Sequence, residues 1–405
     1  MYAPWLLTIV LTAASEATVP SSPHLLLAKP AWLAQAKMLV QVGDESVKPA
    51  YAALIATADA ALNAGPFSVT SKTMTPPSGD KHDYMSVGPY WWPDPSKPDG
   101  LPYIRRDGEV NPERNNFDNA AMGDMSGRVQ TLALAYYLSG DERYAEHAAR
   151  LLRVWFLDAD TRMNPNLNFG QAIPGKCDGR AVGIIDTAGL PRLVDAILLL
   201  AGSPHWTEAD QQGLVDWFGA YLDWLRENVY GRMEAMTHNN HGVWYDVQVM
   251  SFALFAGKAD VARAVAELSK ERRIAEQIQP DGSQPAELAR TKSFSYSLYN
   301  LEAFFELAQL AEHVDVDLWN YKTEDGRSIR KALDWLVDNA IGKTKDEWTY
   351  EQITSFDPAE LASFLRRAAL IYDEPRYEAI RTELVGNAPS TDGNIFFYPP
   401  PRAKN

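Results

Sequence analysis

Cysteine is almost missing from this chain of 405 residues, which contains Cys177 and no second cysteine. A single thiol cannot form an internal disulfide, and it excludes a metal site built from several cysteine ligands. Chain length sets no limit on core size. Two or three average domains would fit, and (α/α) toroids commonly use this length as one unit.

Basic residues are fewer than acidic ones: the chain has 38 Lys and Arg and 53 Asp and Glu, which gives a formal net charge of −15. Nucleic-acid binding needs basic patches that release counterions, so this balance argues against a nucleic-acid partner. A polyanionic substrate would instead need a local basic cleft, acting over one Debye length of about 8–10 Å. Candidates for that cleft are Arg105, Arg106, Arg114, Lys176, Arg180, Arg290 and Lys292.

Long hydrophobic runs are also lacking, and no segment after the N-terminus approaches the roughly 18 apolar residues of a membrane-spanning helix. The apolar stretch Pro4–Leu11 is too short to span a membrane, and with the small residues near Ala17 it resembles a signal peptide without a basic start. The alternatives are a mis-chosen start codon and an apolar first helix. We expect residues 1–17 to be a signal peptide, residues 18–405 to be one domain, and the protein to be periplasmic or secreted.

Sustained alternation of polar and apolar residues is nearly absent, whereas apolar residues recur at spacings of three and four. The pattern predicts an all-α protein whose helices pair into antiparallel hairpins, as in an (α/α) toroid or barrel. The expected helices are 31–42, 47–64, 119–139, 142–157, 186–201, 207–228, 241–256, 259–278, 294–313, 327–341, 357–371 and 374–385.

Two long irregular segments, residues 66–118 and 159–185, interrupt this helical pattern. Both are rich in Pro, Gly, Asn and aromatic residues, and neither has the composition of a disordered linker. Long ordered loops in a compact domain are usually functional, although a loop packed on its own aromatics is the alternative. Flat aromatic faces match the C–H faces of pyranose rings, so these loops suit a sugar-binding groove.

One segment, Thr237–Asp246, places amide and imidazole side chains at an expected helix start. If the helix begins at Asn239 or Asn240, its free N–H groups and positive dipole end face a bound carboxylate, and Asn240 adds a donor. The same dipole disfavours a protonated imidazole, so His241 stays neutral and able to accept a proton. Simple helix capping is the other interpretation of Asn239.

The spacing predicts two faces for this helix. Val243, Val247, Met250 and Leu254 form an apolar stripe, whereas His241, Tyr245 and Gln248 lie on a polar face. We therefore expect Tyr245 to reach the same cleft as His241. A zinc site at His238-x-x-His241 is a weaker interpretation, because no further ligand has a characteristic spacing.

A second segment, Asp281–Tyr296, supplies a guanidinium and a phenol. An apolar stripe of Phe294, Leu298, Leu301 and Phe305 leaves Tyr296 and Tyr299 on another face, with Lys292 beside them. A cation at Arg290 or Lys292 is expected to lower the pKa of the nearby phenol, which helps it act as base and then as acid. Tyr296 is preferred, and Tyr299 is the competitor.

These residue types meet the demands of β-elimination in a polyuronate. The C6 carboxylate must be neutralised so that the C5 proton becomes acidic, a base must take that proton, and an acid must protonate O4. Asn, His, Tyr and Arg can supply all three functions.

The combination resembles the alginate-lyase-domain family of bacterial polysaccharide lyases over roughly residues 80–310. The resemblance rests on the blocks His82–Pro93 (HDYMSVGPYWWP), Pro102–Gly108 (PYIRRDG), Asn239–Gly242 (NNHG), Arg290–Ser293 (RTKS) and Tyr296. It implies an incomplete (α/α) toroid, with long loops forming a substrate groove, and β-elimination without a metal or other cofactor. The Tyr90-Trp91-Trp92 block is closer to the branch that includes glucuronan and broad polyuronate lyases.

The resemblance also implies site residues. The catalytic set would be Asn240, His241, Arg290 and Tyr296. Apart from the resemblance, we expect an acidic polysaccharide to be bound by Tyr90, Trp91, Trp92, Arg105, Gln171, Arg180, Asn239, Tyr245, Lys292 and Tyr299. Mannuronate and glucuronate share their C4 and C5 configurations and require syn elimination, in which one tyrosine can be both base and acid. Guluronate requires anti elimination, with His241 as base and Tyr296 as acid.

Two other functions remain open. An (α/α) glycoside hydrolase would need two carboxylates across the bond, and Asp186, Asp246 and Glu287 are available. A glycan-binding protein without catalysis would use the aromatic loops as a stacking platform.

Overall fold

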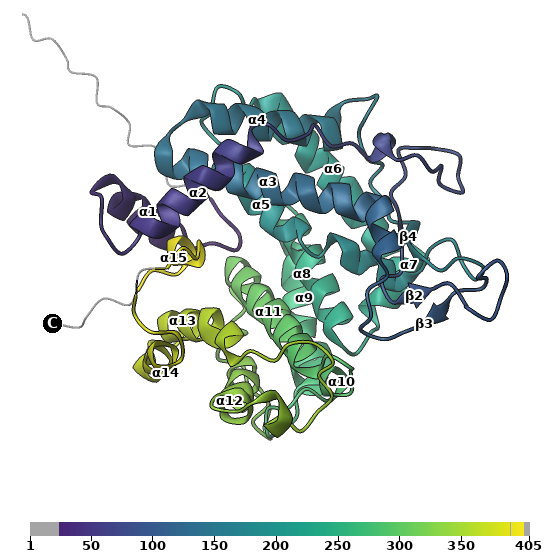
Figure 1. Cartoon of the computed structure of the whole chain (residues 1–405). Coiled ribbons are helices and arrows are strands. Elements are labelled where there is room, and N and C mark those ends of the chain that lie inside the picture. Colours follow the sequence, from purple (N-terminus) through teal and green to yellow (C-terminus); the bar gives the residue numbers. More distant parts are fainter. Residues whose placement is uncertain (1–23, 389, 401–405) are drawn as a thin grey trace, which may run out of the picture.

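The computed structural model describes residues 24–388 and 390–400, so the expected signal peptide lies outside the described residues. The all-α prediction is confirmed, and the helices form an incomplete (α/α) toroid (Figure 1). The longer helices are α1 Pro30–Gln41, α2 Lys48–Ala61, α3 Asp118–Ser139, α4 Glu142–Leu152, α5 Leu190–Leu199, α6 Glu208–Glu227, α8 Asn240–Phe255, α9 Ala259–Ser269, α11 Ser293–Ala311, α12 Ile329–Ala340, α13 Ala362–Ile371 and α14 Pro375–Val385. Shorter ones are α7 Val229–Ala235, α10 Pro285–Leu288 and α15 Asn394–Phe397.

An arc of packed helices forms the centre of the toroid. In this arc α3 contacts α5, α5 contacts α8, and α8 contacts α11, while α4 packs on α3 and α9 packs on α8. Helix α8 is buried continuously from Gly242 to Ala253. The two helices that begin with the predicted catalytic segments, α8 and α11, therefore lie side by side in the core.

Local chemistry explains the tight links between paired helices. Gly140 ends α3 in the left-handed conformation, with φ 76°, which glycine adopts without steric cost. Asp141 then caps α4 by accepting a hydrogen bond from the Arg143 N–H. At the start of α6, Thr207 and Asp210 form a reciprocal capping box.

The two long irregular segments pair with each other. Strand β1, Met85–Val87, runs parallel to β4, Phe169–Ala172, and so ties the first segment to the second. Strands β2, Trp91–Trp92, and β3, Ile104–Arg105, form an antiparallel hairpin. These strands are two to four residues long, too short to produce a recognisable alternation in the sequence.

The N-terminal and C-terminal helices of the described chain meet, because α1 packs against α15. Trp32 and Tyr398 form an edge-to-face pair with ring centroids 5.9 Å apart at this contact. In Figure 1 the β2–β3 hairpin lies at the opposite side of the molecule from this junction.

Several expected boundaries differ from the structure. The helix expected at 186–201 begins at Leu190, where Pro191 occupies the first turn. The helices expected at 142–157 and 259–278 change after Leu152 and Ser269 into π-helical turns, Arg153–Leu157 and Lys270–Ala275. Among the described helices, none is long and apolar enough to cross a membrane.

Candidate active site

The two predicted catalytic segments meet at the N-terminal ends of α8 and α11. His241 stands in the first turn of α8, and Tyr296 stands in the first turn of α11. Arg290 precedes α11, in the turn that follows the short helix α10. Because α8 and α11 pack against each other, residues some fifty positions apart in sequence share one end of the helix pair.

Tyr296 is surrounded by groups that contact its hydroxyl and its ring. The Arg290 Nη2 atom donates a hydrogen bond to Tyr296 Oη at 2.8 Å, and its guanidinium carbon lies 3.8 Å from the ring centroid. The hydroxyl of Tyr90, just before β2, lies 2.6 Å from the same oxygen. Tyr299 instead packs on Trp244 with ring centroids 5.0 Å apart. Of the two candidate tyrosines, Tyr296 is the one that contacts the arginine.

Arg290 lowers the pKa of Tyr296, as expected, but the net shift is upward. Burial and the hydrogen bond with Tyr90 raise the pKa of Tyr296 well above its usual value, and Arg290 only partly opposes them. Tyr296 therefore carries its proton at neutral pH. In this state it is a proton donor.

Asp107 holds Arg290 in place, a role that the sequence did not reveal. Its carboxylate accepts hydrogen bonds from Arg290 Nε at 3.1 Å and Nη2 at 2.8 Å, from Arg105 at 2.7 Å and from Thr291 at 3.1 Å. Partial burial would raise the pKa of Asp107, but its bonds with Arg290 and Arg105 outweigh burial and lower the pKa well below the usual range. The loop after β3 is thus tied to α11 by an ion pair.

His241 is oriented by a buried carboxylate. Its Nδ1 atom lies 2.6 Å from Oε1 of Glu234, which is fully buried on α7. A carboxylate only accepts, so Nδ1 carries a hydrogen, and in the neutral ring Nε2 keeps its lone pair. The His241 side chain remains 19% exposed. Its free nitrogen can therefore act as a proton acceptor.

Asn240 has a partner that the sequence did not predict. Its backbone N–H and its Nδ2 atom both donate to the carboxylate of Glu287, at 2.6 and 2.7 Å. Glu287 therefore occupies the donors that were expected to face a bound sugar carboxylate. Burial raises the pKa of Glu287, and the hydrogen bonds from Asn240 oppose this shift. One Nδ2 hydrogen and the amide oxygen of Asn240 remain available.

The turn before α8 is supported by a buried arginine in the π-helical turn after α9. Arg273 pairs with Asp246 at 2.8 Å and donates to the carbonyl groups of Ala235 and Thr237, each at 2.8 Å. At Gly242 an added Cβ would lie 2.3 Å from the Thr237 oxygen and 2.5 Å from Arg273 Nη1. Glycine is required here because the backbone passes against this arginine.

The family model for alginate lyases matches residues 68–348 of the chain. The chain belongs to the alginate lyase family. It is accordingly a polysaccharide lyase. A crystal structure of an alginate lyase from Bacteroides ovatus is 42% identical, covers 94% of this chain and 100% of its own, and superposes with a TM-score of 0.90.

More distant structures share the fold. Alginate lyase A1-III from Sphingomonas species A1 is 16% identical, covers 93% of this chain and 98% of its own, and has a TM-score of 0.58. A variant of alginate lyase A1-III in complex with a tetrasaccharide is 15% identical, covers 92% and 95%, and has a TM-score of 0.59. A comparison with curated proteins finds no match.

The β2–β3 hairpin of this lyase carries aromatic rings flanked by cations. Lys176 and Arg180 lie over the ring of Trp91, at 4.4 and 5.8 Å from its centroid, and Arg106 lies 5.1 Å from that of Trp92. Near α11, Lys292 Nζ lies 5.8 Å from the ring centroid of Tyr90. Four of the cations expected to line a basic cleft, Lys176, Arg180, Arg106 and Lys292, therefore lie beside aromatic rings at this hairpin.

Gln171 is hydrogen-bonded to Arg180, the arginine that lies over Trp91 of the hairpin. Arg180 donates to the Gln171 carbonyl at 2.8 Å and to its Oε1 at 2.9 Å. Gln171 has φ 49°, in the left-handed region that non-glycine residues rarely adopt. Its amide also donates to Asp186 at 2.9 Å. Backbone strain of this kind persists where surrounding contacts fix the conformation.

Tyr245 does not lie in the candidate site, and the predicted polar face of α8 is wrong. Tyr245 is buried and donates its hydroxyl to the Leu225 carbonyl at 3.0 Å, while the buried Gln248 accepts from Thr187 at 2.6 Å. Both are core residues, because α8 is surrounded by other helices. Asn239 precedes α8 without capping it, and its Oδ1 is buried without a hydrogen-bond partner.

The structure also shows the residues of the two weaker interpretations, the zinc site at His238 and His241 and the carboxylates of a glycoside hydrolase. His238 is exposed and pairs with Glu276 at 2.6 Å, and the described residues include no group of three His, Cys, Asp or Glu arranged to hold a metal ion. The carboxylates considered for hydrolysis already have partners: Glu287 binds Asn240, Asp246 binds Arg273, and Asp186 accepts from Tyr84 at 3.0 Å and Ser86 at 2.5 Å.

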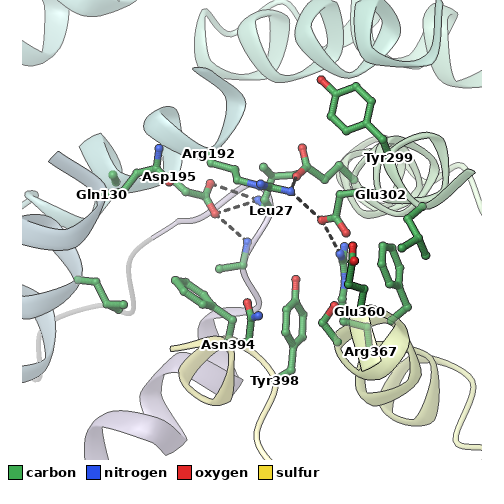
Figure 2. A pocket seen from close by; sticks show the side chains of 18 of the residues that line it. Leu27, Gln130, Arg192, Asp195, Tyr299, Glu302, Glu360, Arg367, Asn394 and Tyr398 are labelled. Carbon is green, nitrogen blue, oxygen red and sulfur yellow. Dashed lines mark hydrogen bonds and ion pairs between the residues drawn. The ribbon is translucent and has the colours of Figure 1, made fainter. Parts of the chain in front are cut away.

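A cavity of about 590 Å³ lies beside α11, and Tyr299 is among the residues that line it (Figure 2). Its charged lining comprises Asp195, Glu302, Glu306, Glu360, Arg192 and Arg367. Arg192 and Arg367 each donate to Glu302 at 2.7 Å, and Asp195 accepts from the N–H groups of residues 26–28. Carboxyl groups outnumber guanidinium groups here, so a polyanion would be repelled. The basic hairpin is the better match to an acidic substrate.

Proposed function

We propose that this lyase cleaves a 1,4-linked polyuronate, either alginate with its poly-mannuronate blocks or glucuronan, by β-elimination. The products would carry 4,5-unsaturated uronate at the new chain end. The observation that carries this proposal is the contact of Arg290 with Tyr296 at 2.8 Å, beside an α8 helix that begins with Asn240 and His241. A guanidinium, a phenol and an imidazole with a free Nε2 are the groups that uronate elimination requires.

Neutralisation of the C6 carboxylate is assigned to Arg290, with Asn240 and Asn239 as further donors. Asp107 fixes the guanidinium through Nε and Nη2, and no hydrogen bond from Nη1 is found among the described residues. Nη1 can thus donate to a substrate carboxylate without loss of the Asp107 pair. Once these donors neutralise the C6 carboxylate, it can take up the negative charge that develops at C5 as the proton leaves.

The proton transfers depend on the uronate. On mannuronate and glucuronate, syn elimination lets Tyr296 act as both base and acid, with His241 positioning the phenol or the carboxylate. On the guluronate residues of alginate, anti elimination divides the transfers between His241 and Tyr296. His241 accepts the C5 proton on Nε2, because Glu234 engages Nδ1. Tyr296 donates its proton to O4, because its raised pKa keeps the phenol protonated and Arg290 already donates to its oxygen. The C5–H bond breaks, the C4=C5 double bond forms, and the C4–O4 bond breaks as O4 takes the tyrosine proton.

Binding of the polymer is assigned to the hairpin and its neighbours. Trp91 and Trp92 offer ring faces for sugar stacking, and Lys176, Arg180 and Arg106 lie against those rings. Arg105 is exposed at the hairpin edge, and Lys292 faces Tyr90. These cations offset the negative net charge of the whole chain at short range.

The test is the ultraviolet absorbance of the conjugated C4=C5 bond while the protein acts separately on poly-mannuronate, poly-guluronate and glucuronan, with and without EDTA. A rise on one or more polymers supports elimination and shows which C2 and C5 configurations are accepted. Insensitivity to EDTA supports chemistry without a metal ion. Chain shortening without absorbance would favour hydrolysis, and binding without shortening would favour a non-catalytic protein.

Export to the periplasm or the medium is proposed on the signal-like residues 1–17. Polyuronates are large polymers outside the cytoplasm, so an exported enzyme would meet them directly. Mass spectrometry of the mature N-terminus, after expression with the full sequence, tests this proposal. An uncleaved N-terminus on a cell-retained protein would count against it.

A further inference from the structure

The first turn of α11 is capped by a residue that lies far along the chain. The residue at the N-cap position, Lys292, provides no side-chain hydrogen bond, although the first N–H groups of a helix have no intrahelical acceptor. The Ser293 N–H donates instead to the Glu351 carbonyl at 3.0 Å. The Phe294 N–H donates to Oε1 of Gln352 at 3.1 Å. Gln352 therefore has the role that an N-cap side chain usually has from within its own helix.

The side chain of Gln352 is 5% exposed, and both ends of its amide have hydrogen-bond partners. Its Nε2 atom lies 3.0 Å from Ser295 Oγ, 3.0 Å from Thr354 Oγ1 and 2.8 Å from the Ser355 carbonyl. The amide thus bonds to two successive residues of α11, to Phe294 through its oxygen and to Ser295 through its nitrogen. A carboxylate at this position could accept from Phe294 but could not donate to the Ser355 carbonyl.

Backbone pairing holds the same stretch of chain. Lys292 and Gln352 form an antiparallel bridge, and the Ile353 N–H donates to the Thr291 carbonyl at 2.9 Å. At Gly108 an added Cβ would lie 2.5 Å from Thr291 Oγ1 and 2.8 Å from Ile353 Cδ1. The loop after β3, the turn before α11 and the segment around Gln352 therefore meet at one junction.

This junction lies between the two groups whose contact the proposed elimination needs. Arg290 precedes the capped stretch, and Tyr296 follows it in the first turn of α11. Their 2.8 Å hydrogen bond depends on how the turn and the helix are placed relative to each other. In the described part of the chain no hydrogen bond joins Gln352 to either residue, so any effect on them acts through the backbone. A misplacement of about 1 Å can lower a rate by about 10²-fold.

We propose that Gln352 is a positioning residue that fixes the geometry of Arg290 and Tyr296 by capping α11 from a distant segment, an inference that rests on the proposed function. The effect belongs in kcat more than in KM, because the rings and cations assigned to polymer binding lie at the hairpin. Gln352 also lies beyond residues 68–348, the part of the chain that the family model matches.

The test compares Gln352→Met with Gln352→Glu in steady-state cleavage of the accepted polymer. Methionine has a similar shape and removes both hydrogen bonds, so kcat should fall by about 10- to 10²-fold while KM changes by less than about threefold. Glutamate keeps an acceptor for the Phe294 N–H at the positive end of the helix dipole, so it should recover most of the lost kcat. Rates are measured well below the unfolding temperature of each variant, so that every protein compared is folded.

Thr207→Ala is the matched control, because Thr207 caps α6 by accepting the Asp210 N–H at 3.2 Å and none of the residues assigned to the candidate site lies on α6. It should lower the unfolding temperature and leave kcat unchanged. The positioning role would be overturned by an unchanged kcat in Gln352→Met, by equal losses in the two Gln352 variants, or by a similar loss in Thr207→Ala. If the unmodified protein forms no unsaturated product, the proposed function itself fails and this inference fails with it.

Discussion

Glu234 accepts the Nδ1 hydrogen of His241 at 2.6 Å from a position with no solvent exposure. The second oxygen of this carboxylate, Oε2, is buried without a hydrogen-bond partner. A buried polar atom without a partner lowers stability, so its presence beside a candidate base has a functional explanation. Glu234 selects one histidine tautomer and leaves Nε2 as the reactive nitrogen.

Glu234→Gln should therefore lower kcat more than it raises KM. The glutamine amide can rotate to donate to Nδ1, which would move the histidine hydrogen to Nε2 and remove the base. We expect a loss within the range of about 10²- to 10⁴-fold that general acid–base groups contribute. Steady-state rates on the accepted polymer measure this effect. Combining it with His241→Ala should add little further loss, because both act through one group; a multiplicative loss would contradict the assignment.

Tyr296→Phe should abolish most of the elimination, whereas Tyr299→Phe should retain most of its kcat. Only the Tyr296 hydroxyl contacts Arg290, and Tyr299 is directed against Trp244. The expected loss for Tyr296→Phe is about 10²- to 10⁴-fold. Initial rates of ultraviolet absorbance at saturating polymer provide the measurement. The reverse order of the two losses would move the catalytic role to Tyr299, one turn further along α11.

Asp107→Asn should lower the unfolding temperature by the same amount at pH 5 and pH 7, and by less at pH 3. The folded pKa of Asp107 lies below the value of about 3.9 in an unfolded chain, so the ion pair stabilises the fold above that pH. This contribution is lost as the pH falls through the folded pKa. Thermal unfolding of both proteins across this range checks the trend. A deficit that changes between pH 5 and pH 7 would assign the stabilisation to another group.

Gly242→Ala should destabilise the lyase and reduce its activity together. The added methyl group would collide with the Thr237 carbonyl and with Arg273, neither of which is free to move. Overpacking of this kind typically costs about 1–3 kcal/mol. Gly123→Ala is the matched control, because Gly123 is an exposed residue of α3 and, apart from its chain neighbours and the nearby backbone of its own helix, no atom lies within 4 Å of the added carbon. The control should gain up to about 1 kcal/mol from higher helix propensity, as chemical denaturation would show.

The sequence by itself determined the helical class and most helix positions, because apolar spacing reflects backbone geometry over a few residues. It also placed His241 and Tyr296 at helix starts, since capping and turn signals are local. It misassigned Tyr245, because the spacing rule assumes one buried face and α8 is enclosed on all sides. Burial around a central helix depends on its neighbours, which the local pattern does not contain.

Only the tertiary structure decided the partners of the candidate catalytic groups. Glu234 meets His241 across the link between α7 and α8, Glu287 meets Asn240 over 47 positions, and Tyr90 meets Tyr296 over 206 positions. Such contacts leave no periodic signal, since they follow from how α7, α8, α11 and the hairpin pack. The charge environment depends on them as well: burial and Tyr90 reverse the pKa shift that Arg290 alone would give Tyr296. Desolvation is set by the surrounding fold, whereas sequence proximity shows only the nearest charge.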